Sequence, residues 1–290
     1  MSTMTYDRRE QDLGNIIHFE HVNVTVPDQR LAQLYYIAGL GFTRDPYLMV
    51  DDQNIWANGG QTQFHLPTRK AQVLRGFVDI VVPDLGALQQ RLADVKDRLA
   101  GTLFKFEMRD KYVATMCPWG NHHRLFGAGP EFGDFTLGIT RVEFPVPRGH
   151  APGIAKFYRE VMKTRAACNM ENGAATARAS VGYRQEMVFR ETDAPIVPYD
   201  GHHVAIYIAD FSGPHAWLRD HGLVTQESNP WQYRFNDIVD PDTGTKLFEI
   251  EHEVRSGTHP MFARPLVNRN PEQRQPTYQR GRDAFVPGMA

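Results

Sequence analysis

Histidine side chains stand in strand-like segments at widely separated points of the chain. His21 and His203 open segments that read HVNVTV and HVAIYI, and His65 lies in the segment QTQFHL. A neutral imidazole can bind a divalent metal ion, or it can hold a carbonyl or carboxylate group of a substrate. Glu249, in the segment KLFEIE, could add a carboxylate. These residue types indicate a site for a metal or for a small oxygen-rich molecule.

Two arginines lie in similar strand-like segments. Arg124 and Arg141 stay protonated at physiological pH, so neither can bind a metal ion. A guanidinium that faces a cavity favours an anionic ligand, and a structural salt bridge is the alternative role. Glu143 follows Arg141 by two residues and shares its face, because side chains alternate along a strand.

The elements that must position these residues form a repeat. Four segments share one strand-like shape: HVNVTVPD at 21–28, FVDIVVPD at 77–84, RVEFPVPR at 141–148 and HVAIYIAD at 203–210. Each alternates and is rich in β-branched residues, as strands are. The spacings are 56, 64 and 62 residues between the equivalent positions Val22, Val78, Val142 and Val204.

A helical pattern follows each of these predicted strands. In the second copy, Leu85, Leu88 and Leu92 recur at three- and four-residue steps, which places them on one helix face. Short strand-like runs come next, with turn signals such as Asn172-Gly173 between them. Each copy is therefore interpreted as a βαβββ module in a chain of the α+β class. Two modules side by side would form a curved sheet around a cavity, and four would form two such halves.

Composition limits the classes of partner. The chain has 290 residues, 41% of them hydrophobic and 23% charged, with a formal net charge of −2. That charge disfavours nucleic acid and anionic membrane surfaces, so we expect a small-molecule ligand, with homo-oligomers possible. The first residues do not resemble a signal peptide, and no apolar run approaches the ~18 residues of a membrane span. We therefore expect a cytoplasmic protein.

Several motifs resemble those of the vicinal-oxygen-chelate superfamily, which includes glyoxalase, bleomycin resistance protein and extradiol dioxygenase. FEHVNVTVPDQRLAQLYYIAGLGF at 19–42 looks like the opening of a module, and AKFYREVM at 155–162 looks like the equivalent helix in the third copy. PWGN at 118–121 and DPDTG at 240–244 look like the turn before the last strand of a module. The resemblance spans about residues 16–256.

The resemblance implies a fold and a domain division. It implies four βαβββ modules paired into two glyoxalase/extradiol dioxygenase-like half-barrel domains. The N-terminal domain would span residues 16–127 and the C-terminal domain residues 138–256, on either side of the glycine-rich segment GAGPEFGDFTLG. Residues 257–290, rich in Pro, Arg and Gln, would form an extended C-terminal arm.

The resemblance also implies candidate ligands. Four-module dioxygenases hold Fe(II) or Mn(II) in the C-terminal half with two histidines and one carboxylate. The corresponding metal set here is His203, Glu249 and Glu143, with Arg141 where a first histidine is expected. An Arg141–Glu249 ion pair that closes the site is the alternative. The remaining family positions give a substrate-binding set of His21, His65, Arg124 and Arg141.

Two classes of function follow from the resemblance. The first is a metal-dependent enzyme, extradiol dioxygenase-like or a lyase or isomerase, that acts on a small oxygen-rich or aromatic metabolite. The alternative is a metal-free protein of the drug-resistance type that binds or sequesters a small molecule. The superfamily fold hosts both classes, so the side chains of the site must decide between them.

Overall fold

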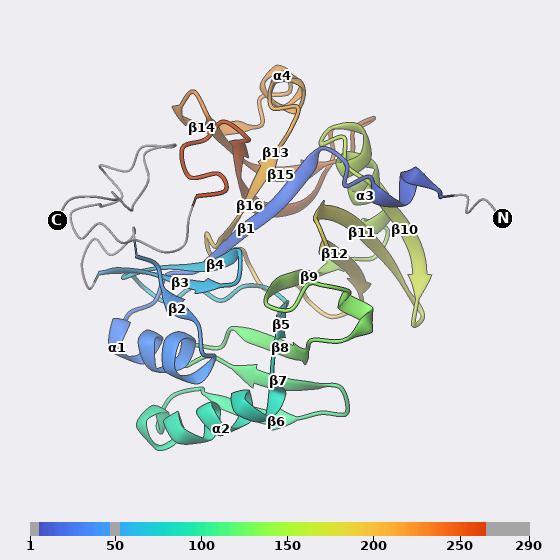
Figure 1. Cartoon of the computed structure of the whole chain (residues 1–290). Coiled ribbons are helices and arrows are strands. Elements are labelled where there is room, and N and C mark those ends of the chain that lie inside the picture. Colours follow the sequence, from blue (N-terminus) through green and yellow to red (C-terminus); the bar gives the residue numbers. More distant parts are fainter. Residues whose placement is uncertain (1–5, 47–52, 265–290) are drawn as a thin grey trace.

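Two eight-stranded mixed sheets form the body of the molecule (Figure 1). The computed structural model describes residues 6–46 and 53–264. In spatial order, the first sheet contains β14 (Val224–Asn229), β15 (Gln232–Val239), β16 (Lys246–Ser256), β13 (His203–Ile208), β1 (Ile16–Asn23), β4 (Thr62–Pro67), β3 (Asn54–Gly59) and β2 (Thr43–Arg44). The second contains β10 (Ala166–Glu171), β11 (Ala174–Gly182), β12 (Gln185–Thr192), β9 (Gly138–Pro147), β5 (Phe77–Val82), β8 (His122–Gly127), β7 (Tyr112–Met116) and β6 (Lys105–Met108).

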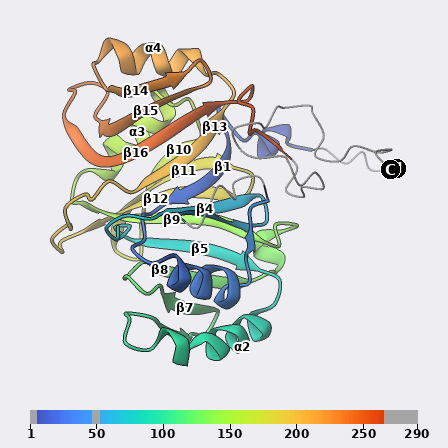
Figure 2. The same ribbon diagram turned by 90° about the vertical axis from the view of Figure 1, so that its left-hand side faces the viewer.

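Each module carries one helix between its first and second strands. The helices are α1 (Gln29–Ala32), which continues as the π-helical turn η2 (Gln33–Gly39), then α2 (Leu85–Val95), α3 (Ala151–Glu160) and α4 (Ser212–Asp220). The side chains of Asp28 and Asp84 accept hydrogen bonds from backbone N–H groups and so cap the first two helices. In Figures 1 and 2, α4 and α2 lie at opposite ends of the molecule. The predicted α+β class with four βαβββ modules is confirmed.

The modules combine in an order that the sequence did not predict. The first sheet joins the first and fourth modules, and the second sheet joins the second and third. The expectation that neighbours along the chain share one sheet is therefore wrong. The two first strands of each sheet, β1 with β13 and β5 with β9, are antiparallel neighbours at its centre. The division of the chain into domains at 16–127 and 138–256 stays a prediction.

Gly76 helps to explain this order. It lies just before β5, at the end of the segment that leaves the first sheet, with a φ of +141°. A Cβ atom there would lie 1.8 Å from the carbonyl oxygen of Glu143 on β9. Only glycine combines this backbone conformation with so close an approach. The chain can therefore pass against β9 and place β5 beside it.

Two buried tyrosine–histidine pairs connect helices to strands in equivalent ways. Tyr35 Oη lies 2.8 Å from His123 Nδ1, and Tyr158 Oη lies 2.7 Å from His252 Nε2. Each pair joins the helix of one module to the last strand of the next module along the chain. Sequence neighbours therefore pack through their helices, while their strands belong to different sheets.

The buried histidines of these pairs predict an acid-sensitive fold. Burial lowers the pKa of His123 to about 3 and that of His252 to about 4, whereas an unfolded histidine titrates near 6.5. Their stabilising contribution is complete above pH 6.5 and is lost as the pH falls towards these folded values, because the unfolded chain binds more protons. We expect each to lower the free energy of unfolding by about 2 kcal/mol at pH 5 relative to pH 7. Urea denaturation at both pH values measures this change.

A control identifies the groups responsible. The double variant His123→Gln/His252→Gln should lose less stability between pH 7 and pH 5 than the wild type does. An equal loss in both proteins would contradict the assignment.

The described start of the predicted C-terminal arm packs on the first sheet. Phe262 contacts Tyr207 at 4.8 Å between ring centroids, and Arg264 forms a buried ion pair with Asp45. Residues 265–290 of the predicted arm lie outside the described residues. Within 6–46 and 53–264, no helix is long and apolar enough to span a membrane.

Candidate metal centre

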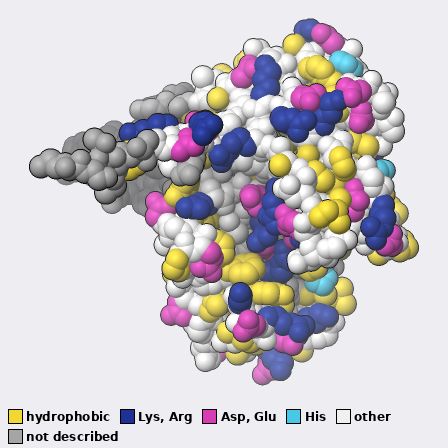
Figure 3. Space-filling model, turned by 90° about the vertical axis from the view of Figure 1, so that its right-hand side faces the viewer, with side chains coloured by type: hydrophobic (Ala, Val, Ile, Leu, Met, Phe, Trp, Pro, Cys, Tyr) yellow, Lys and Arg dark blue, Asp and Glu magenta, His cyan; other side chains and the backbone are white. Residues whose placement is uncertain are grey.

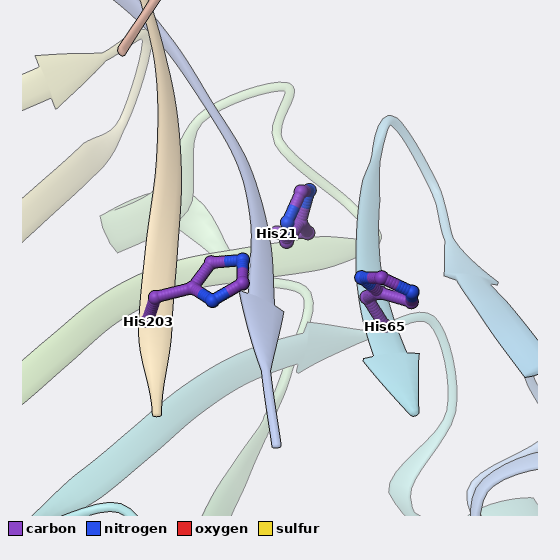
Figure 4. Close-up of side chains that lie close together, drawn as sticks. All are labelled: His21, His65 and His203. Atoms are coloured by element: carbon purple, nitrogen blue, oxygen red, sulfur yellow. The ribbon is translucent and has the colours of Figure 1, made fainter. Parts of the chain in front are cut away.

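Three histidines from distant parts of the sequence meet on one face of the first sheet (Figure 4). His21, His65 and His203 lie on the neighbouring strands β1, β4 and β13. Asn23 pairs in register with both His65 and His203, and His21 precedes it by two residues on the same strand. One ring nitrogen from each histidine lies within 4.8 Å of the others. This spacing is within reach of a shared metal ion.

The Nε2 atoms of these histidines are buried and have no hydrogen-bond partner in the described part of the chain. A buried polar atom without a partner is costly, and native proteins rarely leave one unless a ligand, ion or water satisfies it. Three histidines with such atoms and with ring nitrogens near one another indicate a cation site, because neutral imidazole nitrogens are metal ligands.

Burial keeps the histidines in the form that binds metal. It lowers the pKa of His65 and of His203 well below the ordinary value, and the neighbouring imidazoles lower it further. A nearby carboxylate, Glu253, opposes this in both cases. Both imidazoles are therefore neutral at physiological pH and present a lone pair.

A carboxylate fixes the orientation of His21. Glu20 Oε2 lies 2.9 Å from His21 Nδ1, which donates to it and leaves Nε2 free for a ligand. Adjacent residues of a strand normally point to opposite faces. Here β1 has a bulge between Phe19 and His21, so Glu20 reaches the same site as its neighbour. This pairing has the pattern of the carboxylate–histidine–metal arrangement.

His65 is held by two neighbours. Its ring stacks on Trp56 with 3.9 Å between centroids, and its Nδ1 lies 2.6 Å from the side-chain amide of Asn23. An asparagine amide can present either its oxygen or its nitrogen to such an atom. With the oxygen towards Nδ1–H, Nε2 keeps its lone pair for a metal.

Two glutamates of β16 complete the site beside His203. Glu251 Oε1 lies 3.3 Å from His203 Nδ1, and Glu253 Oε2 lies 3.5 Å from His203 Nε2. Arg234 binds both carboxylates, and Arg255 binds Glu253. The β16 strand is parallel to β13 and pairs Glu251 with His203, which places these side chains on the same face.

Arg255 joins two parts of the site. It donates to Glu20 and forms an ion pair with Glu253, and it also contacts the hydroxyl of Tyr207. Although burial opposes it, the charge of Arg255 lowers the pKa of both carboxyls well below the usual range. Both stay ionised.

The charges of the site leave room for a cation. Its carboxylates are Glu20, Glu251 and Glu253, and its guanidiniums are those of Arg234 and Arg255. Apart from the histidines, the sum is three negative charges against two positive ones, or −1. This net negative charge attracts a cation.

A cavity leads to this centre. It has a volume of about 700 Å³, and His203, Glu251 and Arg234 line its wall together with the loop around Arg69 and Lys70. A smaller hollow of about 280 Å³ is lined by Glu20 among other residues. We call the histidine face and the larger cavity the first cavity. Its size suits a small metabolite.

The structure groups the candidate site residues differently from the sequence-based prediction. It unites His203 with His21 and His65, which the sequence placed in different halves, because β13 is the neighbour of β1. Glu249 does not face His203; its carboxylate pairs with Lys246, further along β16. The expected closing pair of Arg141 and Glu249 does not form.

The other predicted site residues lie on the second sheet. Glu143 binds Arg124 and Arg190, so it is not a third ligand to a metal at His203. Arg124 and Arg141 both bind Asp79 and do not face His21 and His65. Their placement in the cavity of the histidines was wrong, because β5, β8 and β9 belong to the sheet that lacks β1.

Known proteins resemble this chain in structure but not in sequence. No known family profile matches the chain, and no curated protein matches it in sequence. A candidate dioxygenase from Bacillus subtilis shares 15% identity at a TM-score of 0.58, over 91% of this chain and 90% of that one. Glyoxalase I from Zea mays shares 14% identity at a TM-score of 0.56, over 87% of this chain and 96% of that one. The chain has the vicinal-oxygen-chelate fold. At these identities the likeness establishes the fold alone, so the chemistry must come from the side chains.

Proposed function

We propose that this vicinal-oxygen-chelate protein is a metal-dependent enzyme whose divalent ion is held by His21, His65 and His203. The observation that carries the proposal is the convergence of one ring nitrogen from each of three histidines, whose buried Nε2 atoms have no hydrogen-bond partner among the described residues. The charge of −1 at the site also favours a cation.

The donor set favours particular metals. Imidazole ligands suit Fe(II), Ni(II), Cu(II) and Zn(II), whereas Mn(II) and Mg(II) prefer oxygen donors. Three imidazoles beside carboxylates therefore favour Fe(II) or Zn(II) here. When bound, such an ion would act as a Lewis acid that polarises two neighbouring oxygens of a substrate.

Glu251 is the residue best placed to move a proton. Burial raises the pKa of its carboxyl, with Arg234 opposing the effect, and its side chain lines the first cavity. A carboxyl with a raised pKa accepts and returns a proton more readily near neutral pH. Glu253, by contrast, is held ionised by Arg255 and serves to balance charge.

These roles favour a lyase or isomerase over a ring-cleaving dioxygenase. Non-haem Fe(II) oxygenases use two histidines and one carboxylate, whereas this centre presents three histidines and keeps a carboxyl beside them. We propose proton abstraction next to a carbonyl group of a small oxygen-rich metabolite, with Glu251 as the base. A bound metal would polarise that carbonyl group.

Metal analysis tests the proposal. Protein purified without chelator, measured by plasma emission, should contain about one equivalent of Fe or Zn per chain. Extraction with a chelator should lower the thermal midpoint, because a ligand that binds only the folded state stabilises it. If the apoprotein takes up neither Fe(II) nor Zn(II) stoichiometrically under anaerobic conditions, the metal-free alternative is the better account.

Substitution of Glu251 tests the catalytic role. Glu251→Gln keeps the shape of the side chain and removes its ability to accept a proton. We expect it to bind metal as the wild type does and to lower kcat by about 100-fold or more on α-hydroxycarbonyl or hemithioacetal substrates. Glu249→Gln, on the same strand but paired with Lys246, is the matched control. Equal loss in both variants would count against Glu251 as the base.

A further inference from the structure

The second sheet has a cavity in the place that corresponds to the metal centre. The two sheets have equivalent strand orders, so β5 and β9 correspond to β1 and β13. Asp79 pairs in register with Arg141 and with Arg124, as Asn23 pairs with His203 and with His65. The three histidine positions are therefore occupied here by Phe77, Arg124 and Arg141. We call this region the second cavity.

This exchange changes the kind of ligand that the second cavity can hold. Guanidiniums cannot bind a metal, and their fixed charge repels one. They do present planar pairs of N–H donors that match a carboxylate. Arg124 and Arg141 therefore place cationic hydrogen-bond donors where the first sheet has imidazoles that can accept.

The acidic groups of the second cavity do not use all of these donors. Asp79 is fully buried and binds Arg124 at 2.5 Å and Arg141 at 2.8 Å. Glu143 binds Arg124 at 3.0 Å and Arg190 at 3.2 Å. Arg190 also lies 3.7 Å from the carboxylate of Glu171, so Arg141 has the fewest acidic partners of the three arginines.

Arg141 carries the donors that remain. Its closest contact with Asp79 is through Nε, and its two terminal nitrogens form no hydrogen bond with any residue that the structure describes. The side chain is one quarter exposed and lines both hollows of this region. Arg124, by comparison, has more partners. Its guanidinium pairs with two carboxylates and also lies 4.7 Å above the ring of Phe77.

The walls of the second cavity combine this charge with aromatic surface. A hollow of about 390 Å³ is lined by Tyr112 and Phe126, and it adjoins one of about 950 Å³ that shares Phe126 and Arg141. Known ligand pockets have volumes of roughly 300–1,000 Å³. On the face drawn in Figure 3, basic and acidic side chains gather beside hydrophobic ones in a hollow.

We propose that the second cavity is a binding site for a small aromatic carboxylate. The carboxylate pairs with the terminal nitrogens of Arg141, with Arg124 beside it, and the flat body of the ligand lies against Tyr112 and Phe126. A carboxylate would give these terminal nitrogens hydrogen-bond acceptors. This site is separate from the metal centre, and it does not depend on the proposed catalytic function.

Titration with 4-fluorobenzoate, followed by ¹⁹F NMR, tests the site. The wild type should bind it saturably with one site per chain, and neutral 4-fluorobenzyl alcohol should bind at least about tenfold more weakly. Arg141→Gln should weaken binding of the benzoate at least about tenfold. Arg148→Gln, which changes an exposed arginine paired with Asp193, should bind as the wild type does.

Further variants keep the outcome decisive. Arg141→Lys retains the charge without the planar fork and should give an intermediate loss, and it replaces the glutamine variant if circular dichroism shows that variant to be unfolded. His203→Ala should bind the benzoate normally. Absence of saturable binding in the wild type would overturn the proposal. So would binding that depends on His203 rather than on Arg141, since that result would place the anion at the metal centre.

Discussion

Replacing His203 with alanine is expected to abolish stoichiometric metal binding, with affinity reduced by more than about 100-fold. Loss of groups that only orient a ligand costs 10–100-fold, so loss of a ligand itself should cost more. His21→Ala and His65→Ala should behave in the same way, because each removes one of the three convergent nitrogens. Titration of chelator-treated protein with Co(II), followed by its visible absorption, measures the affinity and reports the coordination.

The controls for this prediction separate a ligand from an ordinary histidine. His215→Ala removes a partly exposed histidine that pairs with Glu227, and it should leave the affinity unchanged. Glu20→Gln should weaken binding by about 10–100-fold, since it orients His21 and does not itself bind the metal. If His203→Ala and His215→Ala bind Co(II) equally, the metal centre is wrongly placed.

The repeat and its local structure were predictable from sequence. The first strands were expected from the alternating segments that begin at His21, Phe77, Arg141 and His203, and strands run through all four. This succeeded because alternation and helical periodicity are local patterns that the chain itself displays. The likeness to the vicinal-oxygen-chelate fold followed from the same segments and from the turns between them.

The composition of the site was less predictable, because it depends on which modules become neighbours. His21 and His65 were expected in a different half from His203, because neighbouring modules along the chain were expected to pair. No local pattern shows that β13 lies beside β1; a connection can cross between sheets wherever a residue such as Gly76 allows a close approach. Because the first module pairs with the fourth and not with the second, the three histidines that were expected at two separate sites lie together.

The residues that the sequence missed are mostly those that support the histidines. Glu20 follows no alternation rule, because a bulge turns it to the same face as His21. Glu251 shares a strand face with Glu249, and only the pairing of β16 with β13 distinguishes the two. The alternation of β16 thus predicts which face of the strand carries the carboxylate, but not which glutamate of that face lies beside His203.

Replacing Arg255 with methionine is expected to produce the largest loss of stability, and the loss should depend on metal. Arg255 is nearly buried and pairs with both Glu20 and Glu253. Removing one partner of a buried ion pair leaves an uncompensated charge, which costs about 3–5 kcal/mol. Arg148→Met, at an exposed ion pair, should change the free energy of unfolding by less than about 0.5 kcal/mol. Urea denaturation of the apoproteins measures both effects.

Addition of metal should recover much of the stability lost in Arg255→Met. Without the guanidinium, the site carries two uncompensated negative charges. A dication held by His21 and His203 would be close to Glu20 and Glu253, the carboxylates that contact these histidines and that Arg255 otherwise binds. Opposite charges at such short range attract strongly in a buried site. The variant should therefore gain more stability than the wild type from saturating Zn(II), since tighter binding to the folded state gives a larger shift. An equal gain in both proteins would show that the ion binds away from these carboxylates, and a variant as stable as the wild type without metal would show that Arg255 does not balance them.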